Sequence, residues 1–154
     1  MALVPTPETA ARLVVEGGEP IDDLHLTLAF FGSDVRGYFS STAAEMLMRD
    51  VAEAFPPIQA KAMGHALFNP SGDEPCAVYL IGDNDYLPEM YRTIQDLLST
   101  NYDMPRQHTP FIPHTTAGYG VPISKLEYDG AVTYDMLILK WAGESYIAPL
   151  QGIG

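Results

Sequence analysis

Residues 22–32 read DDLHLTLAFFG, an apolar, strand-like run that carries a single histidine, His25. In the second half of the chain, residues 111–120 read FIPHTTAGYG, where a proline-flanked apolar segment again carries histidine, one residue and threonine. Both stretches predict β-strands. Each half of the chain therefore contributes one His-x-Thr strand.

The geometry of a strand gives the repeated motif a chemical meaning. Side chains alternate between faces, so His25 and Thr27 share one face, as do His114 and Thr116. The two residues of each pair stand ~7 Å apart along the strand. Two such pairs beside one cleft would form a phosphate site with four hydrogen-bonding groups, two of them able to exchange protons near neutral pH.

The rest of the chain predicts alternating strands and helices. A first helix enters through Pro7 after a cap at Thr6 or Thr9 and ends at the glycine pair 17–18. Two further helices are predicted at residues 41–55 and 86–99. The strands are expected at residues 2–4, 24–31, 58–68, 76–81, 114–119, 131–141 and 146–150. The order strand, helix, loop, His-x-Thr strand thus occurs twice.

Composition predicts one folded domain over residues 1–154, because 47 % of the residues are hydrophobic and 18 % are charged. The chain has neither an apolar run long enough to span a bilayer nor the features of a signal peptide at its start. We therefore expect a soluble, cytoplasmic protein without a membrane partner, and a monomer. The lone Cys76 excludes an internal disulfide.

The charge balance narrows the class of ligand. Twenty acidic against eight basic residues give a net charge of −12, which repels a long polyanion and excludes duplex nucleic acid as a partner. A small anionic ligand is compatible with this charge, because backbone amides, hydroxyls and a single cation can hold a phosphate locally.

Two histidines and two threonines suit the cleavage of a phosphodiester. One histidine can deprotonate the attacking oxygen while the other protonates the departing one, each contributing ~10²–10⁴-fold. The threonine hydroxyls can hold the non-bridging oxygens as charge moves onto the phosphoryl group. A bell-shaped dependence of rate on pH follows.

The two motifs, His25-Leu26-Thr27-Leu28 before AFFG and His114-Thr115-Thr116-Ala117 after PFIP, resemble those of the 2H phosphoesterases, the LigT-like or 2′,5′-RNA-ligase-like superfamily. The order of elements resembles that family over nearly the whole chain. The resemblance implies an α+β, bilobal fold: two pseudo-symmetric lobes of antiparallel sheet, helices packed outside and a central cleft.

The same resemblance implies an enzyme, a metal-independent phosphodiesterase without a cofactor, with His25, Thr27, His114 and Thr116 as catalytic residues. Members act on 2′,3′-cyclic phosphates of RNA ends, ADP-ribose cyclic phosphate, 2′-5′ oligoadenylates and cyclic nucleotide immune signals. The compact size and the ending GESYIAPL resemble bacteriophage members, which implies a role in counter-defence in the host cytoplasm. Which nucleotide is cleaved, and which histidine is the acid, stay open.

One departure from the family pattern concerns the phosphate cation, because Ala117-Gly118-Tyr119 follows the second motif where many members carry a basic residue. The cation is then expected from Arg106, Lys140 or His108, or Tyr119 stacks on a base instead. The expected substrate contacts outside the motifs are Phe31, which shares the His25 face by parity, Tyr79, Arg106, His108 and Tyr119. Packing in the core is the alternative role for Phe31.

Three other interpretations stand beside the enzyme. A zinc or iron site is disfavoured because the four histidines show no metal-ligand spacing and threonine is a poor ligand for these metals. A catalytically idle module of the same fold would sequester a nucleotide. A purely structural domain would have no need of both His-x-Thr motifs. His65, without a partnered hydroxyl, is expected to be structural.

Overall fold

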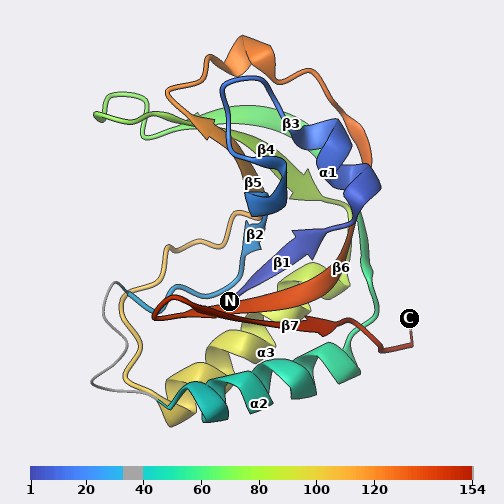
Figure 1. Cartoon of the computed structure of the whole chain (residues 1–154), viewed down its shortest axis with the longest axis vertical. Helices are drawn as coiled ribbons and strands as arrows, with labels where there is room; N and C mark the ends of the chain where they lie inside the picture. The colour runs from blue at the N-terminus through green and yellow to red at the C-terminus, as the bar shows by residue number, and fades with distance from the viewer. Residues whose placement is uncertain (33–39, 154) are drawn as a thin grey trace.

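The structure is a computed structural model that describes residues 1–32 and 40–153, and its central feature is a closed antiparallel sheet (Figure 1). Hydrogen bonding joins the strands in the order β1-β2-β5-β4-β3-β6-β7, and an additional pairing of β1 with β6 closes a ring of six strands. Strand β7 extends the sheet beyond β6. The bounds are β1 Ala2–Pro5, β2 Leu26–Thr27, β3 Ile58–Phe68, β4 Cys76–Gly82, β5 His114–Tyr119, β6 Gly130–Trp141 and β7 Glu144–Pro149.

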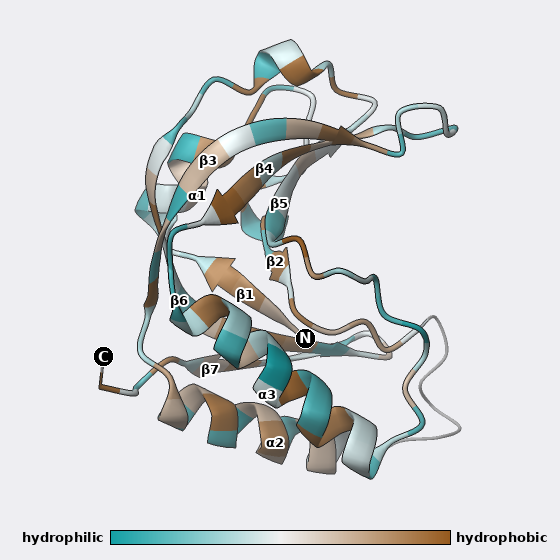
Figure 2. Cartoon of the chain, turned by 180° about the vertical axis from the view of Figure 1, so that it is seen from behind, coloured by the Kyte–Doolittle hydropathy of each residue, from teal (hydrophilic) through white to brown (hydrophobic). Residues whose placement is uncertain are grey.

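Three α-helices within the described residues cover the sheet, so the fold is α+β as expected. Helix α1 (Pro7–Leu13) contacts β1 and β6, α2 (Ser41–Ala54) packs against β6, β7 and α3, and α3 spans Tyr86–Asn101. Figure 2 shows α2 and α3 side by side, with hydrophobic and hydrophilic residues alternating along both. Each long helix buries one stripe at helical spacing, Ala44, Met48, Val51 and Ala52 in α2 and Leu87, Met90, Ile94 and Leu98 in α3.

The strand order contains an internal correspondence. Exchanging β1 with β4, β2 with β5 and β3 with β6 leaves the order around the ring unchanged. Helix α1 lies between β1 and β2 in the chain, and α3 lies between β4 and β5. The repeated order predicted from the sequence is therefore present in the connectivity of the strands, and β2 and β5 are neighbours at its centre.

Two elements are shorter than predicted. The strand expected over residues 24–31 is reduced to Leu26–Thr27, because the amides of Leu28 and Ala29 both donate to the carbonyl oxygen of Met1 and leave the ladder. Helix α1 begins after Thr6, one of the two predicted caps, but ends at Leu13 and not at the glycine pair. Val14 is already extended, which suits a β-branched side chain.

The helices lack the character of membrane spans. Within the described residues, none of them combines the length and the apolar character that crossing a bilayer requires.

Candidate active site

The register between β2 and β5 brings the two motifs together. Leu26 pairs with Thr115, the middle residue of the other motif, in an antiparallel ladder. Extending that register by one residue each way sets His25 opposite Thr116 and Thr27 opposite His114, with Cβ atoms ~5 Å apart. All four side chains lie on one face because each is one residue from the central pair, and all four line one cleft of about 840 Å³.

The two middle residues point the other way, into the core. Leu26 is fully buried, and the buried hydroxyl of Thr115 lies 2.7 Å from the hydroxyl of Tyr134 on β6. This contact lies on the core side of β5. It fixes the position of the second motif, whose histidine and outer threonine lie on the cleft side.

The same kind of hydrogen bond, to the carbonyl oxygen two residues earlier in the chain, orients both histidines. Nδ1 of His25 lies 2.7 Å from the carbonyl oxygen of Asp23, and Nδ1 of His114 lies 2.7 Å from that of Ile112. A carbonyl oxygen can only accept, so Nδ1 carries the hydrogen in each ring. Nε2 is then the nitrogen through which each imidazole can take up or release a proton.

Neighbouring side chains further restrict the motif residues. The ring of Phe68, at the end of β3, meets His114 edge to face with centroids 4.8 Å apart. Oγ1 of Thr116 lies 3.3 Å from Sγ of Cys76, which also lines the cleft. His114 and Thr116 are thus both held by residues of the β3–β4 hairpin.

The cleft has a mixed charge. Among the described residues, Lys140 at the end of β6 is the single lysine or arginine that lines it, beside the carboxylates of Glu19, Asp23 and Glu74. Burial, followed by the nearby Cys76 and the two glutamates, raises the pKa of Tyr119 above its usual value. The Tyr119 phenol therefore stays neutral and able to donate a hydrogen bond.

The substrate contacts expected outside the motifs divide into two groups. His108 and Tyr119 line the cleft, whereas Arg106 is exposed and is not among its lining residues. Phe31 and Tyr79 are buried in the core, where Phe31 packs edge to face on Trp141 and Tyr79 on His65. Phe31 thus takes its alternative role in the core and not a place on the cleft, because the strand ends at Thr27, before the alternation of faces reaches residue 31.

Several lining residues were missed by the sequence analysis. Tyr91 of α3 and Phe111 stack with parallel rings 3.9 Å apart, and both border the cleft. Gln107 and Phe30 also line it, and the two are joined by hydrogen bonds through the backbone of Phe30. The adjacent FF pair offered a signal for Phe30, since one of two neighbouring aromatics generally faces outward when the other is buried.

Two further observations concern metals and the remaining histidine. Nε2 of His65 lies 2.9 Å from the carbonyl oxygen of Tyr128, away from the cleft, in agreement with a structural role. Over residues 1–32 and 40–153, no group of three or more His, Cys, Asp and Glu side chains is placed to hold a metal ion.

Comparisons with known proteins show similarity at the level of the fold. No protein-family model matches the chain, and no curated protein does so. A solved structure described as the crystal structure of TT0787 of Thermus thermophilus superposes with a TM-score of 0.64 at 19 % identity. The match covers 98 % of this chain and 96 % of that one. The α+β architecture is therefore shared over nearly the whole of both chains.

Proposed function

We propose that this chain is a metal-independent phosphodiesterase of the 2H phosphoesterase superfamily that hydrolyses a phosphodiester bond in a small nucleotide. The observation that carries the proposal is the arrangement of two histidines, each with Nδ1 bonded to a carbonyl oxygen and each opposite a threonine across β2 and β5. The two halves that exchange in the strand ring would then be the two pseudo-symmetric lobes of that fold, with the cleft between them.

In the proposed reaction the two imidazoles start in opposite protonation states. Nε2 of the neutral histidine takes a proton from water as the water oxygen bonds to phosphorus. Nε2 of the protonated histidine gives its proton to the departing ester oxygen as the bond between that oxygen and phosphorus breaks. Exchange with solvent restores both rings. Which histidine is the base follows from which ester oxygen leaves.

The other groups of the cleft would hold the phosphate. The hydroxyls of Thr27 and Thr116 donate to the non-bridging oxygens, and the ammonium group of Lys140 supplies the positive charge absent after the second motif. The three carboxylates of the cleft and the net charge of −12 favour a substrate with few phosphates. The biological role that we propose for this reaction is bacteriophage counter-defence in the host cytoplasm.

The test is product analysis by chromatography in EDTA with a panel of phosphodiesters: 2′,3′-cyclic mononucleotides, a 2′-5′ oligoadenylate, ADP-ribose cyclic phosphate and cyclic di- and trinucleotides. Wild type is compared with His25→Ala, His114→Ala and the double variant. The matched control is His65→Gln, which changes a histidine outside the cleft.

Wild type and His65→Gln are expected to cleave one class of substrate. Each single alanine variant should lose ~10²–10⁴-fold in rate. The double variant should lose about as much as either single variant, because both groups act in one step. Wild-type activity retained in the double variant would refute the mechanism, and loss of wild-type turnover in EDTA with recovery in zinc would favour a metal enzyme. Binding without cleavage would identify the idle, sequestering module.

A further inference from the structure

An exposed aromatic residue follows each motif at the same distance. The first half reads His25-Leu-Thr-Leu-Ala-Phe30 and the second reads His114-Thr-Thr-Ala-Gly-Tyr119, so each ring comes three residues after the motif threonine. Phe30 is 52 % exposed and Tyr119 is 54 % exposed, and both line the cleft. The two aromatics therefore occupy corresponding positions in the two halves of the chain.

A break in alternation brings both rings onto the cleft face. Strict alternation from His25 or His114 would turn Phe30 and Tyr119 toward the core. Instead, two consecutive residues are buried after each threonine, Leu28 and Ala29 in one half and Ala117 and Gly118 in the other. In β5 this coincides with a shift in register, where Thr116 pairs with Val78 and Gly118 with Ala77.

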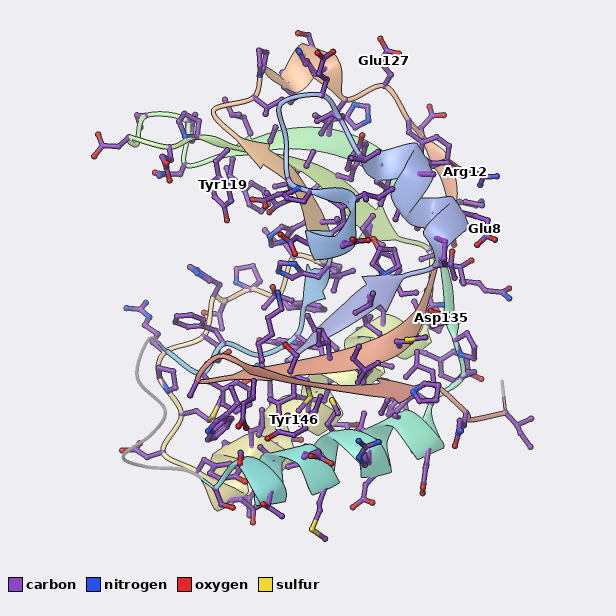
Figure 3. All side chains as sticks on the ribbon, in the orientation of Figure 1. Glu8, Arg12, Tyr119, Glu127, Asp135 and Tyr146 are labelled. Atoms are coloured by element: carbon purple, nitrogen blue, oxygen red, sulfur yellow. The ribbon has the colours of Figure 1, made fainter. Side chains whose placement is uncertain are left out.

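The two rings lie at opposite ends of the His-Thr group. Since β2 and β5 are antiparallel, moving forward from Thr27 and forward from Thr116 leads in opposite directions. Three residues carry each aromatic up to ~10 Å from its threonine. Figure 3 shows Tyr119 projecting from the end of β5 toward the open side of the molecule. The candidate phosphate site is therefore flanked by one ring on either side.

Hydrogen bonds hold the backbone at Phe30 and at Tyr119. The side chain of Gln107 accepts a hydrogen bond from the amide of Phe30 at 2.8 Å and donates to its carbonyl oxygen at 2.7 Å. Tyr119 is paired with Cys76 in the sheet, and the amide of Gly120 donates to the carbonyl oxygen of Pro75 at 2.8 Å. The backbone from which each half-exposed ring projects is therefore held at the cleft, and neither ring is covered by the core.

Solvent-facing aromatic rings in a cleft can bind flat π-systems, and nucleobases stack on such rings irrespective of base identity. The cleft volume of about 840 Å³ lies near the upper end of the ~300–1,000 Å³ typical of small-molecule sites. A single nucleotide would cover the phosphate site and one ring, leaving the other ring exposed.

We propose that the substrate is a dinucleotide unit, two nucleosides joined by the scissile phosphate, with one base on Phe30 and the other on Tyr119. This proposal rests on the proposed function for the position of the phosphate. It selects an internucleotide phosphodiester, in a linear or ring-closed chain, over a 2′,3′-cyclic mononucleotide.

The test measures binding with hydrolysis-resistant probes, so that it does not depend on turnover. Isothermal titration in EDTA compares two adenosine compounds, a phosphorothioate-linked dinucleotide and the 2′,3′-cyclic phosphorothioate of the mononucleoside. The variants are Phe30→Ala and Tyr119→Ala, with Phe30→Tyr and Tyr119→Phe to retain a ring. The control is Tyr86→Ala, which removes a 36 % exposed aromatic at the start of α3, outside the cleft.

Each cleft alanine variant is expected to weaken dinucleotide binding by ~5- to 150-fold, with the ring-retaining variants and Tyr86→Ala close to wild type. For the mononucleotide, at most one of Phe30→Ala and Tyr119→Ala should matter. Equal affinity of wild type for both probes, or dinucleotide binding insensitive to either alanine variant, would overturn the dinucleotide assignment. Failure of the phosphodiesterase panel would overturn the reaction alone, because these titrations require no cleavage.

Discussion

Replacing Thr115 by valine removes one partner of a buried hydrogen bond while keeping the shape of the side chain. Thr115 and Tyr134 are both fully buried, and their hydroxyls are 2.7 Å apart. In Thr115→Val the Tyr134 hydroxyl loses this partner inside the core, which costs about 1–3 kcal/mol of the free energy of unfolding. For a chain of this length each kcal/mol lowers Tm by ~2–4 °C, so a fall of ~2–12 °C is expected.

The double variant distinguishes the cost of losing the hydrogen bond from the cost of leaving the buried Tyr134 hydroxyl without a partner. Thr115→Val with Tyr134→Phe removes both hydroxyls, and its Tm should return toward that of the wild type. The assay is thermal unfolding followed by circular dichroism on the wild type, both single variants and the double variant. Additive losses in the double variant, or an unchanged Tm in Thr115→Val, would refute the reasoning.

Three more predictions concern single side chains. Lys140→Met should lower kcat/KM for the phosphodiester by ~10- to 150-fold, the loss expected for a charge-assisted hydrogen bond, while Lys125→Met, outside the cleft, should match wild type. N-ethylmaleimide should abolish activity by placing an adduct on Cys76 beside Thr116, and Cys76→Ala should be resistant, as checked by residual activity and mass. Burial raises the pKa of Tyr134, so the folded state keeps the phenol proton at a pH where the unfolded state loses it. The contribution of Tyr134 to the free energy of unfolding is therefore complete below about pH 10 and is lost as the pH rises further. Denaturant titration from pH 8 to 11 should therefore show a smaller alkaline loss for Tyr134→Phe than for wild type; equal losses would contradict this.

The sequence predicted much of the local structure because local chemistry determined it. Threonine and proline at residues 6 and 7 located the start of α1, and apolar residues at helical spacing located α2 and α3. The closure of the sheet was not predictable in the same way. It depends on the pairing of β1 with β6, and the partners are brought together by the whole ring of strands.

The candidate site was predictable to the extent that residues repeat in the sequence. The two His-x-Thr motifs predicted four side chains on two strands, and the structure sets all four on one cleft. Parity predicted Phe31 on that cleft, but two consecutive buried residues after Thr27 bring Phe30 there instead. Phe68 contacts His114 from a distant hairpin, a relation that a single sequence does not encode in its spacing.

The interchangeable strand order makes this chain the single-chain counterpart of a symmetric dimer. In a true two-fold dimer every substitution appears in both subunits, so the two copies of a site stay identical. Here each half can change alone: Phe68 packs on His114, and α2 lies between β2 and β3 while a short 3₁₀ turn, Ile123–Lys125, lies between β5 and β6. Because the halves are joined in one polypeptide, the two histidines occupy corresponding strands and can still acquire different surroundings. A reaction in which one histidine donates a proton and the other accepts one requires such a difference.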